Sequence, residues 1–224
     1  MKNLLSTVKI RVNEKIYAKD PETSELGKKI IRESILLIDE IGFDHFTFKK
    51  LGLRIGSNES SIYRYFDNKH KLLVYLSSWY WGWTEYKLVL KTTNVADPVE
   101  KLKAAIAVVT EKIEDDITTL HINEKILNRI IIFEFTKIFQ TKEVDEENKE
   151  GFFLIYKSVI NRVVEIASAL NPSYPYTKSL VSALVEGALH QHFLSDHLKS
   201  ITNANKETSV TDIYTDIILK TLRP

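Results

Sequence analysis

Hydrophobic residues recur every three or four positions along most of the chain, the spacing that is typical of amphipathic α-helices. Gly42 is placed where a left-handed C-terminal cap would end a first helix, whose apolar face consists of Leu26, Ile30, Leu37, Ile38 and Ile41. A heptad-like seam then predicts a long helix that begins near Lys69, and its members are Leu72, Leu76, Trp79, Trp83, Tyr86 and Leu90.

Further helices are predicted from Asp97-Pro98, where proline takes the first turn, and then over 126–139, 152–170, 177–198 and 212–222. The acidic stretch 143–150 indicates a solvated connection or a frayed helix end, and strand-like alternation occurs only over 8–12. We therefore expect an all-α fold in two parts, a small bundle and a larger one, with the boundary inside the long helix.

Residues 47–69 contain two short helical patterns joined by a tight turn. Thr47 can cap the first helix, Gly56 supplies the turn, and Asn58 can cap the second helix. Two short helices joined by a three-residue turn with a glycine are typical of a helix-turn-helix, whose second helix enters the major groove of DNA.

The exposed face of the second helix is polar and offers groups suited to base edges and phosphates: Glu59, Ser60, Ser61, Tyr63 and Arg64. Asp67 can cap the following helix, so Lys69 lies in its first turn, where a phosphate would meet a cation and free backbone N–H groups. The plainer alternative is a helical hairpin with a polar outer face, but such a hairpin does not require an aromatic cluster followed by a lysine at its exit.

With these motifs, the stretch 31–73 resembles the DNA-binding domain of the tetracycline-repressor (TetR) family. The residues that carry the resemblance are Gly42-Phe43, Thr47, Ile55-Gly56, the run from Ser61 to Phe66, Asn68-Lys69 and Leu72-Leu73. The resemblance implies that phosphates are held by Thr47, Tyr63, Tyr65 and Lys69. It also implies that the groove is faced by Lys49, Glu59, Ser60, Ser61 and Arg64.

Four positions depart from the family pattern. Gly52 stands where alanine is usual, which lowers helix propensity by up to ~1 kcal/mol. Ser57 replaces a small apolar residue, and Asn58 replaces the usual serine or threonine cap. Glu59 is an anion directed at DNA, which could accept a hydrogen bond from a cytosine amino group or could weaken binding. These departures bear on the operator sequence rather than on the binding mode.

Charge is divided unevenly along the 224 residues. The 31 Lys and Arg against 30 Asp and Glu give a net charge of +1, which at first argues against a nucleic-acid partner. Residues 1–72, however, hold 14 basic and 10 acidic residues and carry +4, which leaves −3 for the remainder. The local field governs DNA affinity, and a dimer doubles the phosphate contacts. The basic residues before the first helix could form a DNA-binding arm, or this extension could pack on the body: Lys9, Arg11, Lys15 and Lys19.

Composition excludes several other classes. The absence of cysteine excludes a disulfide scaffold, a thiolate metal site and a cysteine nucleophile. No apolar stretch approaches the ~20 residues that cross a bilayer, and no secretory signal is present, so we expect a soluble cytoplasmic protein without a membrane partner. The sequence contains no readable nucleophile–base spacing, no HExxH helix and no glycine-rich phosphate loop. We therefore expect a protein that is not an enzyme and that has no cofactor.

Aromatic residues are concentrated in the larger part, where a packed core is the plainer interpretation. The family resemblance implies a pocket there for an unknown small organic effector, and the residues expected to line it are Trp79, Trp83, Tyr86, Phe133, Tyr156 and His190. His192 and Asp196 lie four positions apart on one helical face, but a third ligand at a suitable spacing is missing, so no metal site is predicted.

The last two predicted helices carry small and apolar residues that would permit close helix packing: Ser179, Ala183, Gly187, Ile213 and Ile217. The resemblance implies that these helices form a homodimer and that the operator is palindromic double-stranded DNA. The predicted domains are a basic extension (1–24), a helix-turn-helix DNA-binding domain of three helices (25–72), and a helical ligand-binding and dimerisation domain (73–224). The predicted function is a ligand-responsive transcriptional regulator, in the simplest case a repressor. The alternative is a helical ligand-binding or adaptor protein whose helix-turn-helix no longer reads DNA.

Overall fold

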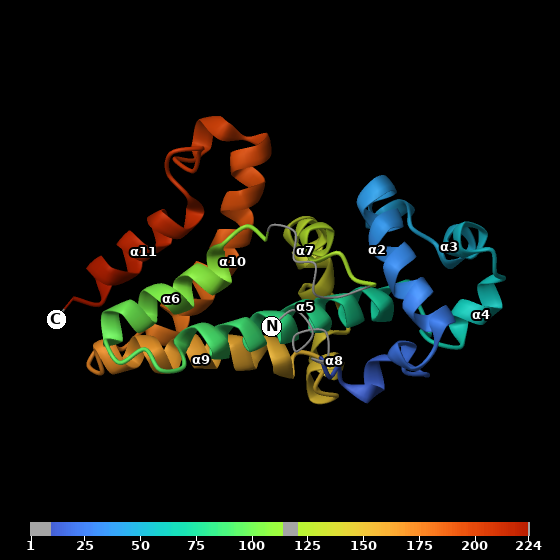
Figure 1. Cartoon of the computed structure of the whole chain (residues 1–224), viewed down its shortest axis with the longest axis horizontal. Coiled ribbons are helices and arrows are strands. Elements are labelled where there is room, and N and C mark those ends of the chain that lie inside the picture. Colours follow the sequence, from blue (N-terminus) through green and yellow to red (C-terminus); the bar gives the residue numbers. More distant parts are fainter. Residues whose placement is uncertain (1–9, 114–120, 224) are drawn as a thin grey trace. The chain divides into compact units, whose positions relative to one another are not determined.

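The computed structural model describes residues 10–113 and 121–223, and this part of the chain folds into ten α-helices and three short 3₁₀ helices without a strand (Figure 1). The all-α prediction is therefore confirmed. The chain divides into two compact units, which we describe separately. Unit 1 comprises Met1–Gly82 and Ile113–Leu154, and unit 2 comprises Trp83–Lys112 and Ile155–Pro224.

Unit 1 contains η1 (Glu14–Ile16), η2 (Pro21–Thr23), α2 (Glu25–His45), α3 (Phe48–Ile55), α4 (Glu59–Tyr63), the first part of α5 (Lys69–Thr92), α7 (Glu124–Phe139) and α8 (Val144–Lys149). Helix α2 packs against both α3 and α7. The centre of this unit is apolar, because side chains from all of its first helices are buried there: Ile30, Ile31, Ile35, Phe46, Leu51, Ile62 and Phe66.

Unit 2 contains the rest of α5, then α6 (Pro98–Thr110), α9 (Leu154–Leu170), α10 (Thr177–His197), η3 (Lys199–Ile201) and α11 (Val210–Thr221). Helices α6, α10 and α11 pack on one another. Local sequence sets where two of them begin. Asp97 accepts the N–H of Glu100 at 2.8 Å at the start of α6. Ser209 and Asp212 form a reciprocal capping box at the start of α11.

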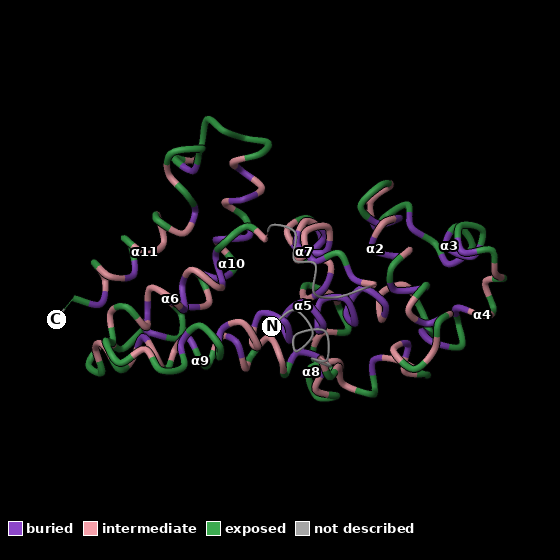
Figure 2. The backbone as a smooth tube through the Cα atoms, viewed as in Figure 1, coloured by how far each residue is buried: buried purple, intermediate pink, exposed green. Residues whose placement is uncertain are grey.

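Helix α5 is buried more completely than its heptad seam predicted. Every residue from Leu72 to Thr84 is buried (Figure 2), so this stretch is enclosed on all sides rather than along one stripe. The seam then ends, because Tyr86 is only partly buried and Leu90 is 55% exposed. A helix that is apolar all round belongs in the centre of a packed structure.

Three local predictions were wrong or only partly right. Gly42 has φ 76° and ψ 154°, a region that glycine alone adopts readily, so the helical geometry of α2 breaks there as a kink followed by one short helical turn, and not as a left-handed cap. The acidic stretch 143–150 forms the short helix α8. Of the strand-like stretch 8–12, residues 10–12 have no regular structure, and residues 8 and 9 lie outside the described residues.

Residues 10–24 of the N-terminal extension pack on unit 1. Ile16 is fully buried, and the N–H of Ala18 donates to the carbonyl oxygen of Tyr65 at 2.8 Å. Lys15 forms an ion pair with Glu150, and the ammonium of Lys19 lies 5.1 Å from the ring centre of Tyr65. These contacts favour the packed alternative over a free basic arm. Lys9, another of the basic residues named for the arm, lies outside the described part.

No helix in the described part of the chain is both long and apolar enough to cross a membrane.

Candidate DNA interface

Local hydrogen bonds build the turn between α3 and α4. Thr47 caps α3 by accepting the N–H of Lys50 at 3.2 Å. Gly56 has a left-handed backbone (φ 68°, ψ 35°), and the N–H of Ser57 returns to the carbonyl oxygen of Gly52 at 2.9 Å. A Cβ on Gly52 would lie only 2.9 Å from the carbonyl oxygen of Ser57. The glycine at this position therefore has a steric reason, since this turn approaches α3 more closely than alanine would permit.

The start of α4 is fixed by the side chain of Asn58, whose oxygen accepts hydrogen bonds from three donors. The Oδ1 of Asn58 accepts the N–H of Ser61 at 2.9 Å, the hydroxyl of Ser60 at 2.9 Å and the hydroxyl of Ser61 at 2.6 Å. Because both serine protons are directed to Asn58, the two hydroxyl oxygens present lone pairs to the outside. These two hydroxyls at the start of α4 therefore act as hydrogen-bond acceptors toward the outside.

Most of the side chains that we expected to face DNA lie at the surface of the α3–α4 pair. Thr47, Lys49, Ser60, Tyr63 and Arg64 are exposed. Glu59 and Ser61 are partly exposed. The ring of Tyr63, 49% exposed, packs edge-on against Phe48 with 5.0 Å between ring centres, which holds the hydroxyl end outward.

Two other predicted phosphate ligands have partners inside unit 1. Tyr65 is 3% exposed, and its hydroxyl lies 2.8 Å from the Oγ of Ser24. The Nζ of Lys69 donates to three carbonyl oxygens near the end of α2, those of Phe43 (3.0 Å), Asp44 (3.2 Å) and Phe46 (3.3 Å). Their phosphate roles stay predictions. In this structure both groups join the end of the helix-turn-helix to α2 and the segment before it.

Charged side chains fix α3 on α2. Arg54 of α3 donates to Glu33 at 3.0 Å and also to Glu40, both of α2. Burial raises the pKa of Glu33, but the hydrogen bonds from Arg54 and Arg32 outweigh it and hold that pKa below its ordinary value. The Nζ of Lys29 donates to the last carbonyl of α3, that of Ile55, at 2.8 Å. Arg54 thus orients α3 on α2.

Helix α7 supports the other side of α2 with residues that sequence reasoning missed. Arg129 binds both carboxylate oxygens of Asp39, at 2.9 and 2.6 Å. Glu134 accepts the N–H of Phe43 at 3.4 Å, directly after Gly42. Lys137 adds an ion pair to Asp44 at 2.8 Å. The paired residues are about 90 positions apart in the sequence, so a local sequence pattern could not predict these contacts.

The expected effector-pocket residues are distributed over both units. Trp79 and Phe133 belong to unit 1, where Trp79 is 3% and Phe133 51% exposed. In unit 2, Trp83 is buried with its ring stacked on Tyr86 at 5.4 Å, Tyr156 donates to Glu186 at 2.9 Å, and His190 is exposed. A cavity of about 830 Å³ in unit 2 is lined by other residues. The aromatic pocket stays a prediction.

The expected dimer residues and the histidine pair have the following environments. Ser179 and Ala183 are exposed on α10, Gly187 is covered by Tyr214 of the same chain, Ile213 is half-buried, and Ile217 is 42% exposed. His192 donates to the carbonyl oxygen of Thr110 and Asp196 pairs with Lys112. Among the described residues no group of three or more His, Cys, Asp and Glu side chains could hold a metal ion.

Comparison with known proteins finds a family match for the helix-turn-helix region and a shared fold for most of the chain. Residues 30–76 match the family model described as bacterial regulatory proteins, tetR family. The sequence has no significant match among curated proteins.

Three solved structures share the fold at 16% sequence identity. The superantigen PfiT has a TM-score of 0.59 over 90% of this chain and 97% of its own. AibR, solved with isovaleryl coenzyme A and operator DNA, has a TM-score of 0.56 over 85% of this chain and 97% of its own. The fatty acid degradation regulator FadR from Bacillus halodurans has a TM-score of 0.52 over 87% of this chain and 93% of its own. At this identity the structures show the fold alone. Residues 30–76 are thus similar to the tetR family of bacterial regulatory proteins, and the chain as a whole shares an all-α fold with AibR and FadR.

Proposed function

We propose that this chain is a homodimeric transcriptional repressor that binds a palindromic operator and releases it when a small organic ligand binds. The observation that carries the proposal is the capped α3–turn–α4 unit, whose outer face is polar and exposed within a domain that matches the family. The proposal assigns no chemical reaction to the chain and places its action on DNA in the cytoplasm.

The fold alone does not decide the function, because the superantigen PfiT has the same fold. The residues of the α3–α4 face therefore have to carry the functional assignment. AibR supports the proposal in a more limited way, since a protein of this fold was solved with both operator DNA and an acyl-coenzyme A. The AibR structure shows that a protein of this fold can bind both DNA and a small molecule.

The distribution of acceptors and donors on the outer face suggests what the operator contains. Glu59 is an acceptor, and Ser60 and Ser61 direct their hydroxyl protons to Asn58, so this end of α4 suits the amino groups of cytosine and adenine. Arg64 is an exposed donor that suits O6 and N7 of guanine. We therefore expect the half-site to place cytosine or adenine under the start of α4 and guanine near Arg64.

The homodimer is supported by apolar side chains on the outside of α10, η3 and α11. Ile201 is 64% and Ile217 42% exposed, and both line a shallow cavity with Ile213 and Tyr214. A second copy of the chain, packed about a two-fold axis, would cover such side chains in both subunits. The same axis would place two α4 helices on successive major-groove faces, which is why the operator should be palindromic.

Selection of binding sites from random duplex DNA with the full chain tests the proposal. We expect an enriched inverted repeat, and fluorescence anisotropy should show affinity that falls steeply with salt because phosphate contacts release counterions. Arg64→Ala should relax the preference at one base position. Lys178→Ala, an exposed lysine in the first turn of α10, should leave both affinity and sequence preference unchanged.

Two results would reject the proposal. An absence of any enriched sequence, with salt-independent or no binding, would favour the alternative of an adaptor that no longer reads DNA. Sedimentation that shows a monomer at micromolar concentration would reject the homodimer and, with it, the palindrome.

A further inference from the structure

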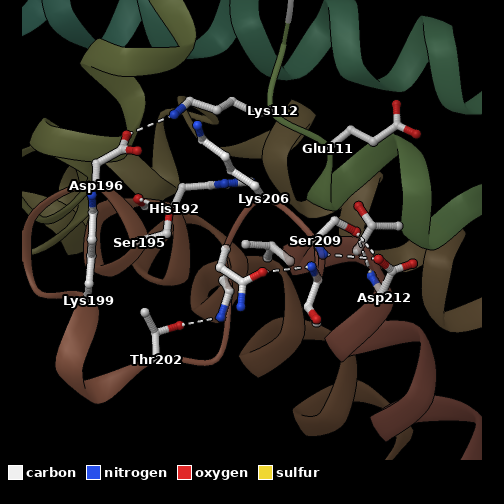
Figure 3. Close-up of a pocket in the computed structure, with 15 residues that line it drawn as sticks. Glu111, Lys112, His192, Ser195, Asp196, Lys199, Thr202, Lys206, Ser209 and Asp212 are labelled. Atoms are coloured by element: carbon white, nitrogen blue, oxygen red, sulfur yellow. Dashed lines mark hydrogen bonds and ion pairs between the residues drawn. The ribbon is translucent and has the colours of Figure 1, made fainter.

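Unit 2 contains a cavity of about 830 Å³ at one end of the α6, α10 and α11 packing, and many of the residues that line it are charged or polar (Figure 3). Its wall is made by the residues after α6, the last turns of α10, η3, the loop 202–209 and the first turn of α11. The volume falls in the range of small-molecule sites, roughly 300–1,000 Å³. None of the aromatic residues expected to form an effector pocket lines it.

Hydrogen bonds between distant segments hold this wall in place. The hydroxyl of Thr110, at the end of α6, lies 2.9 Å from that of Thr211 in α11. The carbonyl oxygen of Thr110 accepts the Nε2–H of His192 from α10 at 2.7 Å. In the loop, the Oδ1 of Asn205 accepts two backbone N–H groups, at 2.7 and 3.0 Å. The cavity is therefore largely formed before any ligand arrives, which lowers the entropic cost of binding.

Cations outnumber anions at one end of the cavity. Lys112 is paired with Asp196 at 2.8 Å. Lys199 and Lys206 line the same cavity and form no ion pair with any described residue. In Figure 3 the ammonium groups of Lys112 and Lys206 and the carboxylate of Asp196 gather at one end, while the carboxylates of Glu111 and Asp212 lie at the other. This end therefore attracts an anionic group.

His192 contributes an acceptor to the same wall. It is 7% exposed, and because a carbonyl oxygen carries no proton, its Nε2 must be the protonated nitrogen. Burial lowers the pKa of His192 and so favours the neutral ring, in which Nδ1 carries a lone pair that can accept a hydrogen bond. A ligand hydroxyl is the group that would satisfy this nitrogen.

We propose that this cavity binds a small hydroxylated organic anion, with its carboxylate or phosphate group on Lys199 and Lys206 and a hydroxyl on the Nδ1 of His192. As a binding site it does not depend on the proposed function. Its role as the effector site rests on the proposed function, because only a DNA-binding regulator has operator release to control.

Isothermal titration of the full chain with two anionic probes tests the site. Citrate supplies carboxylates and glucose 6-phosphate supplies a phosphate, so the arms identify the preferred anion, and glucose serves as the neutral control. We expect at least one anion to bind at sub-millimolar concentration and glucose not to bind. Lys199→Ala and Lys206→Ala should each weaken binding about tenfold, and the double variant about a hundredfold, as for a lost charge-assisted hydrogen bond.

Matched controls separate this site from non-specific charge effects. Lys178→Ala should bind the anions as the parent chain does, since this exposed lysine lies outside the cavity. Propane-1,2,3-tricarboxylate, which is citrate without its hydroxyl, should bind several-fold more weakly than citrate. Both cavity lysines are exposed, so circular dichroism should show an unchanged helix content in the double variant.

Three outcomes would overturn the proposal: no binding of either anion, equal binding of glucose, or unchanged binding by the double lysine variant. Equal affinity for citrate and its hydroxyl-free analogue would overturn the role of His192. Because these titrations contain no DNA, a failure of the proposed repressor function leaves their result intact. Anion binding without any change in operator affinity would establish the site and reject its effector role.

Discussion

The packing of Gly187 against Tyr214 gives a prediction whose magnitude follows from the structure. A Cβ on Gly187 would overlap the Oη of Tyr214 and lie 3.1 Å from its Cζ. Tyr214 also packs on a buried cluster of Ala188, Ala204 and Val210, so its ring cannot move without disturbing that cluster. Alanine in place of glycine in a helix gains about 1 kcal/mol from propensity, whereas overpacking costs about 1–3 kcal/mol.

We expect Gly187→Ala to destabilise the chain by about 2 kcal/mol, because the displaced ring brings the overpacking cost to the upper end of its range. For a chain of this size this lowers Tm by roughly 4–8 °C, to be measured by thermal and urea denaturation at one fixed protein concentration, since dimerisation would make stability depend on concentration. Lys178→Ala, at an exposed position of the same helix, should change stability by less than about 0.5 kcal/mol.

A second variant shows whether the overlap is the cause. Tyr214→Phe removes the oxygen that the new methyl group meets, so in the Gly187→Ala background it should recover more than half of the lost stability. If Gly187→Ala raised the Tm by the propensity gain alone, or if Tyr214→Phe restored nothing, the assigned packing of α10 on α11 would be refuted.

Three further changes test other parts of the structure. Lys69→Met should lower the free energy of unfolding, measured by urea denaturation, by about 2 kcal/mol, because three carbonyl oxygens lose a charged donor. Lys49→Met, at an exposed position, should lower it by less than about 0.5 kcal/mol. Similar values for both variants would contradict the role of Lys69. Gly42→Ala should cost about 1–3 kcal/mol, since φ 76° strains any residue with a Cβ, and an unchanged urea midpoint would argue against this backbone. Burial lowers the pKa of His192, so the unfolded chain binds its proton more readily, and the unfolding free energy should fall as pH drops through the ordinary value of about 6.5. His192→Gln should flatten that slope and the exposed His190→Gln should preserve it; identical slopes in both variants would refute the assignment.

The helix-turn-helix could be predicted from the sequence because its determinants are local. Thr47, Gly56 and Asn58 act within three or four residues of themselves, as caps and as a turn, and each does so in the structure. The surface positions of Tyr63 and Arg64 follow from the same short range. Where local hydrogen bonding decides the conformation, sequence spacing is enough.

The long-range contacts could not be predicted in this way. Lys69 has the type and position of a phosphate ligand, yet its ammonium meets carbonyl oxygens about 25 residues earlier. The cavity of unit 2 depends on Thr110, His192 and Thr211, which are brought together only by the packing of three helices. The sequence feature that came nearest was the pair His192 and Asp196, noted for metal binding rather than for the cavity wall that both residues line.

Chain topology determines how this protein can be cut and recombined. Each unit is assembled from two separate stretches, so the backbone passes between the units at 82/83, 112/113 and 154/155. A fragment that ends after Gly82 would keep α2, α3 and α4 but lose α7, together with the Arg129–Asp39 and Lys137–Asp44 pairs. A chimera that takes α2, α3 and α4 from a similar protein must therefore also adapt α7, or its new α2 will meet mismatched charges. In this architecture the helix-turn-helix is exchanged together with a distant segment, not as a single N-terminal module.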